Sequence, residues 1–274
     1  MDILVLGAKG MLGTEFVNTL SPFHHITAED DINITDRPSC RKILDIKPDI
    51  VINCAAYTNV DNCEIELKTC FDVNGFAIKN LVDICKKGDI KLIHFSTDYV
   101  FDGTKLMGYK ENDFCNPINM YGSSKRIGEL LLFKDSPNNL LIRTSWLYGK
   151  SGKNFVSAIL DNARSRKILK VVNDQYGAPT YTKDLVLAVN KILINNGIFN
   201  ITNQGVCSWF DYAKRILQIA KIDIDIIPIK SSELDRLAKR PINSVLDNSK
   251  FDNLTSNPLR HWEHALKEYL SETL

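Results

Sequence analysis

The chain has 274 residues, 44% of them hydrophobic and 24% charged, and its 34 basic residues nearly balance its 33 acidic ones. No run of Lys or Arg is long enough to follow a phosphate backbone, and no apolar stretch approaches the ~20 residues that span a bilayer, so we expect neither a nucleic-acid nor a membrane partner. The seven cysteines are scattered without a Cys-x-x-Cys pair, and no signal peptide precedes the first strand-like run. These features indicate reduced thiols and a cytoplasmic protein.

Short apolar runs alternate with longer segments of helical periodicity in the first half of the chain. This alternation is typical of βαβ units and predicts an α/β fold with a doubly wound, Rossmann-type parallel sheet. The predicted strands are Ile3–Leu6, a weaker His24–Thr27, Ile50–Ile52, Lys91–Phe95 and Leu140–Ile142, and the predicted helices are Met11–Leu20, Ser39–Ile46, Glu64–Lys86 and Pro117–Phe133.

The pattern loosens after about Trp146, which predicts a smaller, mixed C-terminal lobe. We expect a dinucleotide-binding domain at 1–150 and a substrate-binding lobe at 151–167 and 203–274, with parts of 168–202 packing onto the first domain. The cleft between them would hold the substrate. Helices are predicted at Asn154–Ala163, Thr182–Ile194 and Trp209–Ala220, strands at Ile168–Val172 and Ile198–Ile201, and a stretch mixing strand-like residues with Pro and charges at Ile222–Pro241.

A glycine-rich turn connects the first predicted strand to the first predicted helix. Gly7, Gly10 and Gly13 follow a GxxGxxG spacing, which lets the backbone turn tightly and places a helix N-terminus against a pyrophosphate. Glu29, near the end of the second strand, favours the ribose hydroxyls of NAD. Lys9, inside the turn, favours the 2′-phosphate of NADP. The choice between NADH and NADPH therefore stays open.

Three further residues form a pattern that suits carbonyl reduction. Tyr121 and Lys125 lie four residues apart on a predicted helix, so they share one face. An ammonium group beside a phenol favours the phenolate, and we expect Lys125 to lower the pKa of Tyr121 so that it serves as a general acid. Thr97 ends the preceding strand at the edge where ligands of such folds bind. The three together predict a catalytic triad.

Several motifs along the chain resemble dTDP-4-dehydrorhamnose reductases. The similarity covers nearly the whole sequence, and the TDYVF and NDQYGAPT runs are the most specific parts. The segments that carry it are Asn53–Asp61, Phe95–Phe101, Tyr121–Lys125, Arg143–Gly149, Asn173–Thr180 and Arg240–Ser244. The resemblance implies reduction of the C4 keto group of a dTDP-linked 4-keto-6-deoxysugar, dTDP-4-dehydro-L-rhamnose, by NADPH or NADH.

The resemblance also assigns roles to individual residues. Thr97, Tyr121 and Lys125 would be catalytic, and Tyr121 and Lys125 would also contact the cofactor. The other cofactor-binding residues would be Gly7, Lys9, Gly10, Met11, Leu12, Glu29, Ala55, Ala56, Tyr57 and Asn74. The substrate would meet Val60, Asp98, Tyr99, Trp146, Asn154 and Arg240, although Trp146 also suits core packing, Asn154 a helix cap and Arg240 an ion pair.

Some members of this family bind magnesium through acidic side chains at a dimer interface. Glu15 matches one such position and is a weak candidate, whereas Lys183 stands where an acidic ligand is expected. A charged lysine cannot ligate a hard cation. The sequence therefore argues against a metal site and leaves the formation of a homodimer open.

Two other functions compete with the reductase. The first is a nucleotide-sugar epimerase of the same architecture. A dehydratase is disfavoured because Tyr99, not Glu, follows Asp98. The second is a non-catalytic subunit resembling the regulatory subunit of methionine adenosyltransferase. The presence of Thr97, Tyr121 and Lys125 argues against that role.

Overall fold

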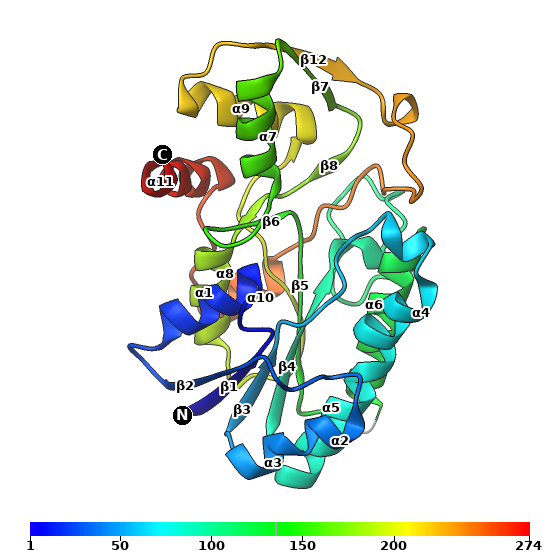
Figure 1. Cartoon of the computed structure of the whole chain (residues 1–274), viewed down its shortest axis with the longest axis vertical. Helices are drawn as coiled ribbons and strands as arrows, with labels where there is room; N and C mark the ends of the chain where they lie inside the picture. Colours follow the sequence, from blue (N-terminus) through cyan, green and yellow to red (C-terminus); the bar gives the residue numbers. More distant parts are fainter. Residues whose placement is uncertain (135) are drawn as a thin grey trace.

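A parallel sheet forms the centre of the computed structural model, which describes residues 1–134 and 136–274. Its strands lie in the order β10-β5-β4-β3-β1-β2, and every neighbouring pair is parallel (Figure 1). The predicted doubly wound sheet is therefore confirmed. The strands are β1 (Asp2–Leu6), β2 (His25–Glu29), β3 (Ile50–Asn53), β4 (Lys91–Thr97), β5 (Leu140–Thr144) and β10 (Gly197–Asn200).

The order of the strands reverses at β1, which has β2 on one side and β3 on the other. Ligands of such sheets bind beyond the carboxyl ends of the strands at this reversal. In register, Leu6 of β1 lies opposite Asn53 of β3. The glycine turn begins directly after Leu6, and the Ala55-Ala56 pair begins two residues after Asn53, so the fold brings both segments to the expected ligand-binding edge.

Helices cover both faces of the sheet (Figure 1). Because side chains alternate along a strand, Ile3 and Val5 pack into the core on one face, and Leu4 and Leu6 pack into the core on the other. The first core includes residues of α1 (Met11–Leu20), α8 (Thr182–Lys191) and α10 (Ser249–Thr255), and the second includes residues of α2 (Arg37–Cys40), α3 (Lys42–Ile46), α5 (Ala77–Gly88) and α6 (Met120–Phe133).

The single helix predicted over Glu64–Lys86 is interrupted. A 3-10 turn, η1 (Asn62–Glu64), precedes α4 (Leu67–Phe71), and a π-helical turn, η2 (Asp72–Phe76), separates α4 from α5. Single π turns inside helices occur frequently at functional sites. Here the π turn carries Asn74, which is fully buried.

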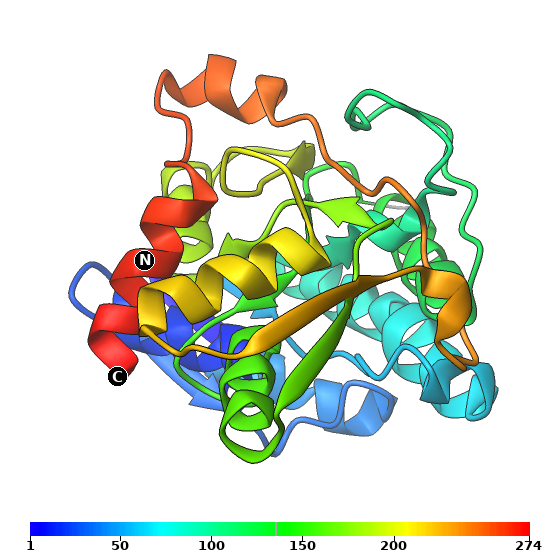
Figure 2. The same cartoon turned by 90° about the horizontal axis from the view of Figure 1, so that it is seen from above.

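The C-terminal part of the chain builds a third core that is rich in aromatic residues, among them Tyr148, Tyr181, Tyr212 and Trp262. β7 (Ile168–Val172) and β12 (Asp225–Ile229) pair in parallel and lie side by side in both views (Figures 1 and 2). The remaining elements are η3 (Asp98–Val100), β6 (Leu147–Tyr148), α7 (Phe155–Ser165), β8 (Tyr176–Gly177), β9 (Thr180–Tyr181), β11 (Cys207–Ser208), α9 (Trp209–Ala220), η4 (Ser231–Glu233) and α11 (Trp262–Thr273).

The segment 168–202 contributes to both parts of the molecule. β7 pairs with β12 in the C-terminal part, whereas α8 packs on α1 and β10 forms the edge of the central sheet. Within the two described ranges, no helix combines the length and the apolar character needed to cross a membrane.

Candidate active site

The glycine turn between β1 and α1 uses its glycines for different purposes. Gly7 has a φ of +71°, and a Cβ there would lie 2.8 Å from the backbone nitrogen of Ala55. A Cβ on Gly13 would lie 2.2 Å from the carbonyl oxygen of Gly7. Both glycines are therefore required by the fold itself. Gly10 has an ordinary φ of −74°, and its nearest contact would be a milder 3.2 Å. The fold therefore constrains Gly10 less than the other two glycines, and Gly10 lines the cavity described below.

Replacement of Gly10 by Val is therefore expected to weaken cofactor binding while the protein stays folded. Each charge-assisted hydrogen bond lost at the helix N-terminus is worth about 1.5–3 kcal/mol, so the Kd for NADPH should rise about ten- to a hundredfold. Fluorescence titration measures the Kd, and the thermal unfolding midpoint controls for folding. Gly10→Ala should give an intermediate Kd. Unchanged binding in Gly10→Val would show that the turn does not hold the cofactor.

The two opposing cofactor cues lie together at the end of β2. The Lys9 side chain is 86% exposed, and its Nζ lies 3.6 Å from Asp30 Oδ2. The Lys9 backbone N–H donates to Asp30 Oδ1 at 3.2 Å. Glu29 accepts a hydrogen bond from the backbone N–H of Asp31 at 2.8 Å. A basic and an acidic side chain thus both stand where the adenosine ribose is expected.

The loop after β3 is fixed by Asn74 from the π turn. Asn74 Oδ1 accepts from the backbone N–H of Tyr57, and its Nδ2 donates to the Tyr57 carbonyl, both at 2.9 Å. The Tyr57 hydroxyl donates to Glu66 instead of facing the cavity described below. Asn74 therefore acts by positioning the loop that carries Ala55 and Ala56.

Thr97, Tyr121 and Lys125 converge on one cavity of about 490 Å³. The predicted residues Gly10, Met11, Leu12, Ala56, Asp98 and Trp146 also line it. Our sequence reasoning did not single out the others: Cys54, Thr58, Phe95, Ser96, Thr144, Ser145, Leu147, Gly152 and Lys153. Most of them, Cys54, Thr58, Phe95, Ser96, Thr144, Ser145 and Leu147, fall inside the motifs that carry the resemblance, whereas no motif marks Gly152 or Lys153.

The start of α6 fixes the position of Tyr121. The helix begins at Met120 and not at Pro117, because Asn119 caps it by accepting from the backbone N–H of Gly122 at 2.8 Å. A Cβ on Gly122 would lie 2.0 Å from the Tyr99 carbonyl oxygen, so glycine allows the helix to approach η3. The rings of Tyr99 and Tyr121 consequently meet edge to face, with centroids 6.0 Å apart.

The charges of the site are set mainly by burial. Burial lowers the pKa of Lys125 to about 8. It raises the pKa of Tyr121, and the nearby Asp98 carboxylate acts in the same direction. The predicted lowering of the Tyr121 pKa by Lys125 is therefore wrong for the chain alone, because desolvation of the phenolate dominates. Tyr121 is consequently protonated at neutral pH, as a proton donor must be.

Asp98 is the other titratable group of the cavity. Burial raises its pKa to about 7, and its Oδ1 accepts from the Thr97 hydroxyl at 3.0 Å. Its Oδ2 is buried and lacks a hydrogen-bond partner among the described residues. A buried polar atom of this kind calls for a partner, which the hydroxyl of a ligand in the cavity would supply.

Of the remaining predicted substrate residues, Trp146 lines the cavity, whereas Asn154 and Val60 do not. Trp146 lines the cavity, where its ring stacks on Trp209 with centroids 3.4 Å apart. Asn154 caps α7 in a capping box with Ser157. Val60 is partly buried and does not line the cavity.

Arg240 is already engaged. Its guanidinium donates to both carboxylate oxygens of Asp61, at 2.6 and 2.7 Å, and this pairing lowers the pKa of Asp61 to about 2. Arg240 also lines a second cavity of about 630 Å³ together with Arg236. Arg236 is exposed overall, but its guanidinium group is partly buried. This burial and the positive charge of Arg240 lower the pKa of Arg236. The positive charge of Arg236 is therefore destabilised by its surroundings in this cavity, and a bound anion would stabilise it.

The residues around Glu15 do not fit a magnesium ion. The Glu15 carboxylate accepts from the hydroxyls of Thr19 and Thr182, at 2.8 and 3.1 Å. The neighbouring Lys183 places an ammonium group beside the acidic residues of α11. Among the residues with described positions, no cluster of three or more His, Cys, Asp or Glu side chains is arranged to hold a metal.

The chain is similar to known proteins over its full length. The family described as RmlD substrate binding domain matches residues 1–274. The spore coat polysaccharide biosynthesis protein SpsK of Bacillus subtilis is 38% identical over 98% of this chain and 97% of its own length. The dTDP-4-dehydrorhamnose reductase of Aggregatibacter actinomycetemcomitans is 37% identical over 97% of each chain. A crystal structure of dTDP-4-dehydrorhamnose reductase from Bacillus anthracis in complex with NADP has a TM-score of 0.96 at 34% identity, over 99% of each chain.

Proposed function

Because the chain belongs to the RmlD substrate binding domain family, which includes dTDP-4-dehydrorhamnose reductases, we propose that it reduces dTDP-4-dehydro-L-rhamnose to dTDP-L-rhamnose with NADPH or NADH. The observation that carries the proposal is the cavity where Thr97, Tyr121 and Lys125 meet the glycine turn of α1. The product would serve the synthesis of a cell-surface polysaccharide, in keeping with the name of the relative from Bacillus subtilis.

The residues of the cavity suit the proton half of this reaction. A bound NADPH or NADH supplies the hydride, which adds to C4 of the sugar. Thr97 would donate a hydrogen bond to the keto oxygen as negative charge gathers there, once its hydroxyl turns to the substrate from Asp98 Oδ1, to which it donates in the chain alone. Tyr121 gives its proton to the same oxygen, which completes the alcohol, and it regains a proton from solvent. Lys125 stabilises the transient phenolate and binds the ribose hydroxyls of the cofactor.

The residues that would hold the cofactor extend from this cavity to the end of β2. Met11 and Leu12 at the N-terminus of α1 would bind the pyrophosphate through backbone N–H groups, while Gly10, whose own N–H donates to the Gly7 carbonyl, would let the ligand approach the turn. Lys9 would meet a 2′-phosphate and Glu29 would meet ribose hydroxyls, so this end of the site accommodates either cofactor.

The second cavity suits the nucleotide diphosphate. Arg236 is the better candidate for the anion than Arg240, because Asp61 already neutralises Arg240. Tyr99 lies beside Tyr121 of the first cavity and within the influence of Arg240 and Arg236 of the second, although it lines neither cavity. Its ring packs against Tyr121, and burial raises its pKa, while the charges of Arg240 and Arg236 act in the opposite direction. A substrate with its sugar beside Tyr121 would thus extend its diphosphate toward Arg236.

Arg236→Ala is expected to raise the KM for the sugar nucleotide about tenfold, because it removes one charge-assisted contact at a partly exposed position. The kcat should change little, since Arg236 is remote from the keto group. Steady-state kinetics separates the two constants. Lys214→Ala on α9, an exposed basic residue outside both cavities, is the matched control. An unchanged KM in Arg236→Ala would place the diphosphate elsewhere.

The direct test of the proposed function is an assay of the purified chain with dTDP-4-dehydro-L-rhamnose and each cofactor in turn. We expect one NADPH or NADH to be oxidised for each sugar reduced, and NMR of the product to give the configuration at C4. Interconversion of nucleotide sugars without net oxidation of the cofactor would indicate an epimerase. Absence of both reactions would favour a non-catalytic subunit.

A further inference from the structure

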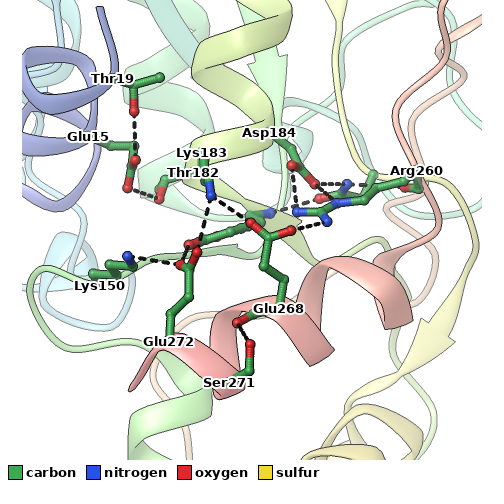
Figure 3. A network of polar contacts seen from close by, with 12 residues as sticks. Glu15, Thr19, Lys150, Thr182, Lys183, Asp184, Arg260, Glu268, Ser271 and Glu272 are labelled. Carbon is green, nitrogen blue, oxygen red and sulfur yellow. Dashed lines mark hydrogen bonds and ion pairs between the residues drawn. The ribbon is translucent and has the colours of Figure 1, made fainter. Parts of the chain in front are cut away.

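A lysine ammonium lies between two carboxylates at the junction of α8 and α11. Lys183 is the second residue of α8, and its Nζ lies 2.6 Å from Glu268 Oε1 and 3.2 Å from Glu272 Oε1 (Figure 3). Glu268 and Glu272 are four residues apart on α11, so their side chains share one face of that helix. The ammonium group thus occupies the space where the two carboxylates converge.

Each carboxylate of this cluster meets further cations or donors from the chain. Glu272 Oε2 accepts from Lys150 Nζ and from the Tyr181 hydroxyl, both at 2.9 Å. The Lys150 contact is the main cause that lowers the pKa of Glu272 to about 2. Glu268 pairs with Arg260. Charges of both signs therefore surround the Lys183 ammonium.

Arg260 closes the cluster on its other side. Its guanidinium donates to both oxygens of Asp184, at 2.8 and 2.9 Å, and Asp184 follows Lys183 on α8. The cations Lys150, Lys183 and Arg260 thus match the carboxylates Asp184, Glu268 and Glu272 in number (Figure 3). These six side chains together carry no net charge, so they offer little attraction to an additional cation.

Glu15 lies at the edge of the cluster and is held by hydroxyl groups. Thr182, the residue before Lys183, donates to Glu15 Oε2 from α8, while Thr19 donates to Oε1 from within α1 (Figure 3). Both oxygens of the carboxylate therefore have donors from the chain. Glu15 is oriented by its own helix and by α8 without a metal ion.

We propose that the Lys183 ammonium is the resident cation of this cluster and takes the place that a divalent metal would need between the acidic side chains. It fastens α11 of the C-terminal part to α8, which in turn packs on α1. Magnesium requires oxygen ligands in a nearly octahedral arrangement. An ammonium group among these oxygens excludes the ion by its volume and by its charge.

The consequence for the natural chain is independence from divalent metal. The thermal unfolding midpoint and the sedimentation coefficient of the full chain are expected to be the same in EDTA and in millimolar MgCl2. Either a saturable rise of the midpoint with Mg²⁺ or a change of sedimentation on adding EDTA would overturn the proposal, because a metal would then occupy the cluster.

Variants at Lys183 provide the positive test. Lys183→Gln removes the cation, so the unfolding midpoint should fall by a few degrees, roughly 2–6 °C for ion pairs that are about one third exposed, in EDTA and in MgCl2 alike. Lys183→Glu removes the cation and adds a carboxylate, so its midpoint should fall further in EDTA and recover in MgCl2 with saturation.

Two outcomes would contradict the role of Lys183. If Lys183→Gln unfolds at the same temperature as the natural chain, the lysine does not fasten α11. If MgCl2 raises the unfolding midpoint of Lys183→Glu no more than that of Lys183→Gln, the position of the lysine ammonium does not suit a divalent cation. Lys214→Glu on α9 controls for a general effect of charge reversal.

Discussion

Replacement of Tyr121 by Phe is expected to lower the turnover of the 4-keto sugar about 10²–10⁴-fold, the usual contribution of a positioned general acid. The substitution removes only the hydroxyl, so the ring still packs edge to face against Tyr99 and the helix start is unchanged. The KM for the sugar nucleotide should stay within a few-fold of the natural value. Oxidation of NADPH at saturating concentrations of both substrates measures the effect.

Tyr99→Phe is the matched control for this experiment. The two tyrosines are neighbours, but only Tyr121 lines the cavity that also contains Thr97 and Lys125. We expect Tyr99→Phe to retain most of the turnover and to change mainly the KM, since Tyr99 lies toward Arg240. If the two variants lose turnover equally, or if Tyr121→Phe stays near the natural rate, another group supplies the proton.

Local patterns in the sequence are sufficient to predict that the three proposed catalytic residues lie together. The carboxyl end of β4 and the first turn of α6 each carry a motif whose position relative to the sheet follows from the order of strands and helices. Thr97, Tyr121 and Lys125 therefore meet in the cavity as the βαβ arrangement requires. The glycine turn is predictable for the same reason, because strand, turn and helix are contiguous.

Properties that depend on distant partners could not be predicted in the same way. Arg240 is neutralised by Asp61, which precedes it by 179 residues, and Lys183 meets Glu268 and Glu272, which follow it by 85 and 89 residues. No local pattern links such pairs. The pKa of Tyr121 was misjudged because the spacing to Lys125 is visible in the sequence, whereas the burial of the phenol is not.

Lys125→Met is expected to reduce turnover at least as strongly as Tyr121→Phe does, and also to raise the KM for the cofactor. The change removes the charge that stabilises the phenolate and the donor for the ribose hydroxyls. One substitution thus removes two functions, whereas Tyr121→Phe removes one. Kinetics with NADPH varied at a saturating concentration of the sugar nucleotide separates the two effects.

The pH dependence of turnover distinguishes the charge of Lys125 from its shape. Burial lowers the pKa of Lys125 to about 8, so the ammonium form predominates below pH 8 and is lost as the pH rises through that value. The natural chain should therefore show an alkaline limb near pH 8. Lys125→Arg keeps its charge throughout this range, so it should be slower but lack that limb. An unaltered limb in Lys125→Arg would assign the titration to another group.

Stability should change in the opposite direction from activity. Because the pKa of Lys125 is lower in the folded chain than the ordinary 10.5, the unfolded chain binds this proton more tightly. Folding at pH 7 is therefore penalised by about 3 kcal/mol, and the penalty fades as the pH rises from about 8 to 10.5. Lys125→Met has a similar volume and no charge, so it should unfold at a higher denaturant concentration than the natural chain at pH 7. A variant that is less active yet more stable would show that the buried charge is retained for the reaction and not for the fold. A loss of both activity and stability would instead make Lys125 a structural residue.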